Sequence, residues 1–208
     1  MKLTPEELEE NGYVLLDEMN HSEIVPFVKK FLRKRTWFSS FYYLSVIVSF
    51  SVLLFFCIKI YHSGIYTFDK ILIQIVFGFL LTLALVPFHE LIHALAYKLE
   101  GAKRTSFDAN FKRFYFLAIA DQFVASKREF KIVALAPFLV ISMALLIVSF
   151  FSGEGWKVTM ATTLTIHSLA CSGDFALLSY FEFNRKKEVV SYDDKENKVS
   201  FFFGRDIN

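Results

Sequence analysis

Apolar residues dominate four stretches of the chain, and polar segments separate these stretches from one another. The stretches cover residues 38–60, 71–99, 130–151 and 156–183. An α-helix needs about 20 mostly apolar residues to cross the hydrocarbon core of a bilayer, and each stretch is long enough to do so. The pattern therefore predicts an all-α membrane protein with four transmembrane helices.

The polar segment between the second and third stretches holds a short apolar run, residues 111–120, which is too short to span a membrane as a helix. With residues 108–110 as a turn, this run and residues 103–107 can pair as a small β-hairpin at the cytoplasmic side of the membrane. The open edge of such a hairpin can pair with an extended peptide. The alternative interpretation is a hydrophobic loop that packs on the helices.

Both ends of the chain are polar. Near the beginning, Thr4 is typical of a helix N-cap and Pro5 of the first helical position, so we expect one or two helices within residues 1–37. Near the other end, residues 189–192 and 199–203 are apolar runs on either side of a charged segment. This pattern indicates a terminal β-hairpin.

Lysine and arginine residues cluster before the first apolar stretch, after the second and after the fourth. By the positive-inside rule these segments are cytoplasmic, which predicts a multi-pass protein of the cell membrane with both termini in the cytoplasm. We expect no cleavable signal peptide, because the first apolar stretch starts late and is long. The predicted organisation is a cytoplasmic N-terminal segment (1–37), a four-span membrane domain (38–183) and a cytoplasmic C-terminal tail (184–208).

The composition supports a membrane protein, since 54% of the residues are hydrophobic and 26 are phenylalanine. The net charge of +2 says little, because the charges are segregated along the chain. Cys57 and Cys171 both lie in apolar stretches, which favours buried thiols over a disulfide framework. We expect the partners to be the lipid bilayer and a membrane protein or peptide substrate, with no nucleic acid.

The second apolar stretch contains an HExxH motif, formed by His89, Glu90 and His93. Histidines four residues apart share one face of a helix, so both imidazoles can bind one divalent metal, normally Zn²⁺. Glu90 can then act as the general base that accepts a proton from the attacking water. The alternative, that these residues share a helix for unrelated reasons, is disfavoured because ionisable groups in a membrane span are costly. The motif predicts a zinc peptidase.

The last apolar stretch offers a third zinc ligand. If this stretch enters the membrane near Lys157, Asp174 lies about 26 Å in, and His89 lies about 28 Å in on the second stretch. Because the two residues are level, we predict Asp174 as the third protein ligand, with water in the fourth position. His167 and then Cys171 are the alternative ligands. A helix–helix hydrogen bond is the simpler role for His167, and a small buried side chain the simpler role for Cys171.

These motifs resemble those of site-2 proteases, a class of intramembrane zinc metalloproteases. The shared features are an HExxH late in a membrane helix, a hairpin-like stretch after it, Ala136-Pro137 in the next span and Gly173-Asp174 in the last. The nearer resemblance is to a small bacterial membrane family known as putative zincin peptidases, of unknown function. The resemblance covers residues 71–183 and implies that Asp174 completes the zinc site. The sequence departs from the site-2 protease pattern before Asp174, where Cys171 and Ser172 stand.

We therefore predict a zinc-dependent intramembrane or membrane-proximal peptidase, in which His89, His93 and Asp174 bind zinc and Glu90 moves protons. The alternative is a non-catalytic, metal-binding membrane scaffold or regulator. A metal-ion transporter ranks below both, because the first and third spans offer few polar groups beyond serine along a path across the bilayer.

Overall fold

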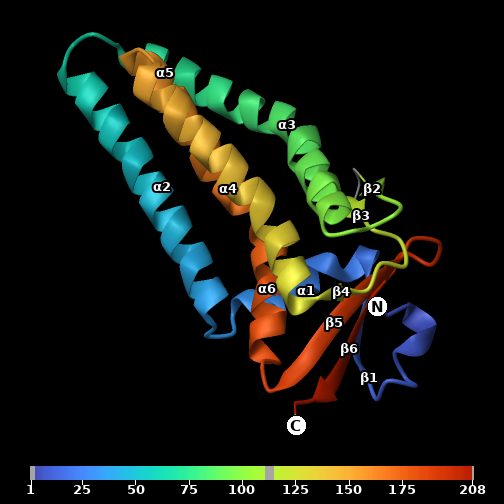
Figure 1. Cartoon of the computed structure of the whole chain (residues 1–208). Coiled ribbons are helices and arrows are strands. Elements are labelled where there is room, and N and C mark those ends of the chain that lie inside the picture. Colours follow the sequence, from blue (N-terminus) through green and yellow to red (C-terminus); the bar gives the residue numbers. More distant parts are fainter. Residues whose placement is uncertain (1–2, 111–114, 208) are drawn as a thin grey trace. The chain divides into compact units, whose positions relative to one another are not determined.

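The computed structural model describes residues 3–110 and 115–207 (Figure 1). It divides into two compact units. Each unit is built from segments that are distant in the sequence. The first consists of Met1–Ser39, Glu90–Ala136 and Gly173–Asn208, and the second consists of Ser40–His89 and Pro137–Ser172.

The first unit contains a four-stranded antiparallel sheet with the strand order β1-β6-β5-β4. Its strands are β1 (Val14–Asn20), β4 (Ala125–Ser126), β5 (Lys187–Asp194) and β6 (Val199–Asp206). Strands β5 and β6 pair along their whole length, which confirms the predicted terminal hairpin. Figure 1 shows that β1, from the N-terminal segment, lies beside β6.

The N-terminal segment contains the expected helical structure, but it also contains a strand that was not expected. Among the described residues before α2, the helical elements are η1 (Pro5–Glu7), η2 (His21–Glu23) and α1 (Ile24–Leu32), and β1 lies between η1 and η2. The helix-start signal is real but local, because Thr4 N donates to Glu7 Oε2 at 2.8 Å around a single turn. Pairing with β6 then determines the conformation of the following residues, as tertiary context often overrides local propensity.

Aromatic side chains form the core of the first unit beneath this sheet. Phe202 of β6 stacks on Phe27 of α1 with ring centroids 5.7 Å apart, and Tyr180 of α6 (Ser172–Phe183) lies 4.5 Å from Phe202. Phe202 is 1% exposed and Tyr180 is 2% exposed. Ser179 Oγ donates to the carbonyl of Phe31 at 2.8 Å, which joins α6 to α1. Burial of these rings stabilises the packing of both helices on the sheet.

A two-stranded antiparallel sheet, β2 (Ser106–Asn110) and β3 (Tyr115–Ile119), confirms the expected hairpin after the second apolar stretch. The turn predicted at residues 108–110 is wrong, because these residues belong to β2, where Asp108 pairs with Leu117. The connection between the strands, residues 111–114, lies outside the described residues.

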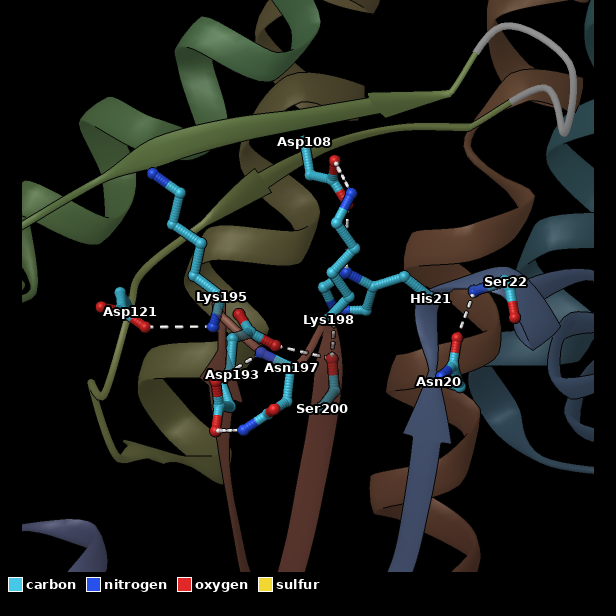
Figure 2. A network of polar contacts seen from close by, with 11 residues as sticks. Asn20, His21, Ser22, Asp108, Asp121, Asp193, Lys195, Asn197, Lys198 and Ser200 are labelled. Carbon is cyan, nitrogen blue, oxygen red and sulfur yellow. Dashed lines mark hydrogen bonds and ion pairs between the residues drawn. The ribbon is translucent and has the colours of Figure 1, made fainter.

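A polar network ties β2 to the four-stranded sheet (Figure 2). Asp108 Oδ1 pairs with Lys198 Nζ at 3.1 Å, and its Oδ2 lies 3.5 Å from His21 Nδ1. His21 Nε2 lies 3.4 Å from Ser200 Oγ, which donates to Asp193 Oδ1 at 2.6 Å. Burial raises the pKa of Asp193, and its contacts with Ser200 and His21 act in the opposite direction. The network holds the hairpin through side chains at the β5–β6 turn.

The second unit packs α5 (Glu154–Ala170) against the first part of α3 (Phe68–Leu99). A Cβ at Gly78 of α3 would lie 2.5 Å from Thr162 Cβ and 2.8 Å from the carbonyl of Thr159, so only glycine allows this approach. Thr163 Oγ1 donates to the Gly78 carbonyl at 3.1 Å, and Thr159 Oγ1 donates to Gln74 Oε1 at 2.6 Å. Small residues and interhelical hydrogen bonds are typical of helix packing in membranes.

Three of the described helices are long and apolar enough to cross a membrane: α2 (Trp37–His62), α3 and α4 (Lys127–Phe151). The expectation of a fourth continuous span over residues 156–183 is not matched. The chain there forms α5, of 17 residues, and α6, of 12 residues, with a break at Cys171. The Cys171 N–H still donates to the His167 carbonyl at 3.0 Å, but its ψ of 7° ends the helix. Counting apolar residues does not detect such a break.

Candidate metal centre

The HExxH motif lies in the last third of α3, and no residue between its histidines interrupts the helix. His89 and His93 are therefore one turn apart on one face. His89 belongs to the second unit, whereas Glu90 and His93 belong to the first. The contacts of the motif thus fall into two sets, one in each unit.

In the first unit His93 lies between a backbone carbonyl and a carboxylate. Its Nδ1–H donates to the Val133 carbonyl of α4 at 3.0 Å, because a carbonyl can only accept. This bond directs Nε2 at Asp174 Oδ1, which is 3.1 Å away on the first turn of α6. Metal-binding histidines commonly donate their other N–H to a carbonyl, which fixes the tautomer and the orientation of the ring.

The distance between His93 Nε2 and Asp174 Oδ1 agrees with the distance between two ligand atoms of one zinc ion. With Zn–N and Zn–O bonds of about 2.0–2.2 Å, two donors of one tetrahedral ion lie about 3.3–3.5 Å apart. The observed 3.1 Å between His93 Nε2 and Asp174 Oδ1 is close to this value. The imidazole and carboxylate are also ligand types that zinc accepts. His93 and Asp174 are thus close enough to bind one ion, and the role of Asp174 as a ligand stays a prediction.

Glu90 is 6% exposed and is held by β3. Its Oε2 accepts a hydrogen bond from the backbone N–H of Ala118 at 2.7 Å. A hydrogen bond to a charged group is stronger than one between neutral groups, so this contact fixes the carboxylate. Because Ala118 directs its N–H at Glu90, the hairpin takes part directly in positioning the proposed base.

In the second unit His89 meets the alternative ligands of the sequence analysis. His89 Nδ1 lies 3.2 Å from His167 Nε2, and the same His167 atom lies 3.8 Å from Cys171 Sγ. His167 is 2% exposed and Cys171 is 1% exposed. The structure thus brings His167 and Cys171 to the first histidine of the motif, and Asp174 to the second.

Two functional groups were missed by sequence reasoning, the Val133 carbonyl and the Ala118 N–H. Both are backbone groups, and every residue except proline carries the same pair, so no side-chain pattern marks them. Their roles depend on the packing of α4 and β3 against α3, and this packing is visible only in the folded structure.

The described chain is mostly helical, and three of its helices are long and apolar enough to cross a membrane. One of them carries a histidine that is oriented toward a carboxylate, which makes a candidate metal centre. A family model described as "Putative zincin peptidase" matches residues 82–188, just over half of the chain, so the chain belongs to this family. Membership indicates a zinc metallopeptidase. No curated protein and no solved structure matches this chain.

Proposed function

We propose that the protein is a zinc-dependent peptidase, similar to site-2 proteases, that hydrolyses a peptide bond within or beside the membrane. His89, His93 and Asp174 hold the zinc ion, and Glu90 is the general base and then the general acid. The contact between His93 and Asp174, with Val133 orienting the ring, is the observation that carries this proposal. The family match supports the same conclusion.

When bound, zinc would acidify water and polarise the scissile carbonyl. The residues of the chain transfer the proton and hold the catalytic carboxylate in position. Glu90 accepts the proton of the attacking water and passes it to the leaving amine, while the Ala118 N–H keeps its carboxylate in place. The low exposure of Glu90 and His93, 6% and 8%, limits access of bulk water and strengthens these interactions.

The substrate is a membrane protein or peptide that presents an extended segment. Residues buried in a membrane helix have their backbone groups paired internally, so a helical substrate must unwind before hydrolysis. Strand β3 lies beside the proposed base and is one of only two strands in its sheet. We propose that it guides the unwound segment by strand pairing.

The sheet of the first unit supports a proposed membrane topology. Strands β1, β4 and β5–β6 come from the segment before α2, the loop before α4 and the tail after α6, and they share one set of backbone hydrogen bonds. We therefore propose that these three polar segments lie on the same side of a bilayer. The lysine and arginine bias makes that side cytoplasmic. In this topology α4 crosses the bilayer away from the cytoplasm, and α5 and α6 together return the chain to the cytoplasmic side.

Metal analysis of the purified protein tests the proposed ligands. Asp174→Ala should lower the zinc content as much as His93→Ala does, since each variant loses one of three protein ligands. Glu90→Gln is the matched control and should keep full zinc, because Glu90 is not a ligand. Full zinc in Asp174→Ala that persists when Cys171 is also replaced by alanine would exclude Asp174 from the site.

A further inference from the structure

A second group of metal-binding side chains lies entirely within the second unit. It consists of His89, His167 and Cys171, whose donor atoms all lie within 4.8 Å of one another. His167 and Cys171 are almost completely buried, whereas His89 is partly exposed. The proposed peptidase reaction assigns no role to His167 or Cys171.

The spacing of these donors agrees with that around one tetrahedral ion. Two nitrogen ligands of such an ion lie about 3.3 Å apart, and a nitrogen and a thiolate ligand lie about 3.6 Å apart, given bonds of about 2.05 and 2.3 Å. His89 Nδ1 and His167 Nε2 are 3.2 Å apart, and His167 Nε2 and Cys171 Sγ are 3.8 Å apart. Both separations are within about 0.2 Å of the expected values.

The packing of α5 against α3 fixes the positions of the three donor side chains. His167 lies in the last turn of α5 and Cys171 is the C-cap, whose N–H still donates to the His167 carbonyl, so the two side chains are one turn apart. The packing of Gly78 against the threonines of α5 holds this helix against α3, which carries His89. The arrangement repeats in α5 the spacing that the HExxH motif uses in α3.

We propose that His89, His167 and Cys171 form a second metal-binding site, which takes a thiophilic ion such as Zn²⁺, Cd²⁺ or Cu⁺. A thiolate ligand selects soft ions, and a buried thiolate is stabilised when it coordinates a cation. The donor set differs in this respect from the histidine and carboxylate set of the proposed catalytic site. Binding releases the thiol proton of Cys171, because the thiolate is the ligand.

The two sites compete for His89, an inference that rests on the proposed function. A neutral imidazole has one nitrogen lone pair, so His89 binds one ion at a time. An ion held by His167 and Cys171 therefore removes His89 from the pair with His93. Excess thiophilic metal should inhibit cleavage by this route.

Cobalt binding tests the second site independently of any peptidase activity. The metal-stripped full-length protein in detergent is titrated with Co²⁺, and thiolate-to-cobalt charge transfer is followed by near-ultraviolet absorption. The matched control is Cys57→Ala, because Cys57 is the only other cysteine in the chain and belongs to neither group of donors. In that variant a charge-transfer band can come only from Cys171, and the site itself is unaltered.

We expect the band in the wild type, in Cys57→Ala and in Asp174→Ala, and its loss in Cys171→Ala. Cobalt binding without a thiolate band in Cys57→Ala would overturn the proposal and leave a hydrogen-bonded His89–His167 pair in its place. This result does not depend on whether Cys171→Ala folds. A peptidase that fails to cleave substrate would leave the band unchanged, so failure of the second site and failure of the proposed function are distinguishable.

Discussion

Replacement of Ala118 by proline should remove the hydrogen bond that holds the proposed catalytic carboxylate. The Ala118 N–H donates to Glu90 Oε2 at 2.7 Å, and proline has no N–H. Proline is tolerated in a strand where the N–H does not point at a neighbouring strand. Because this N–H points at Glu90, the β2–β3 pairing should survive the change.

The size of the effect follows from the burial of Glu90, which is 6% exposed. A hydrogen bond to a charged group contributes about 1.5–3 kcal/mol, and its loss leaves a buried acceptor less well satisfied. At about 1.4 kcal/mol per factor of ten, the cleavage rate should fall about 10-fold to 100-fold. Zinc content should not change, because neither residue is a proposed ligand.

The assay compares Ala118→Pro with Ala118→Gly, which keeps the N–H and loses only the methyl group. Cleavage of a membrane substrate and zinc content are measured on both purified proteins, together with their helical circular dichroism. Cleavage at the wild-type rate in Ala118→Pro would refute the positioning role of the Ala118 N–H. An equal loss in both would assign the effect to the side chain or to the hairpin as a whole.

Two further predictions concern the fold and the topology. Gly78→Ala should destabilise the protein by about 1–3 kcal/mol, since the added methyl meets Thr162 at 2.5 Å. At Gly153, the N-cap of α5, the methyl has open space, so Gly153→Ala should cost less in thermal unfolding, through the weaker cap alone. A cysteine introduced at Gly64 should react with an impermeant thiol reagent added to intact cells, and one at Lys127 should not. Labelling of the Lys127 position from outside would invert the topology.

Much of the helical part of the fold could be predicted from the sequence, because a membrane helix is recognised from one local property, a long apolar run. The same property explains why one continuous span was predicted over residues 156–183, where the apolar run in fact covers two helices. Ser172 and Gly173 are the only local signal of the break, and neither residue requires one. Strand β1 was missed for the opposite reason, since its partner β6 lies almost the whole chain away.

The motif identified the proposed site, because HExxH requires only one helix to bring its side chains together. Asp174 was inferred from its depth along a continuous helix. The helix is in fact broken just before it, yet Asp174 contacts His93 at 3.1 Å. The break separates Asp174 from Cys171, and these residues then serve different units. A sequence pattern could not have shown which unit each residue belongs to. That assignment depends on α5 ending at its C-cap Cys171 and on α6 beginning at the next residue, Ser172.

The central claim is that Glu90 moves protons in a peptidase, and Glu90→Gln tests it most directly. The variant keeps the size of the side chain and should keep zinc, but it removes a general base worth about 10²-fold to 10⁴-fold in rate. Proteomic comparison of membranes from cells with the wild type and with Glu90→Gln should show at least one membrane protein or peptide cleaved only by the wild type. If the cleavage products were identical while deletion of the whole protein still gave a phenotype, the protein would be a metal-binding scaffold and not a peptidase.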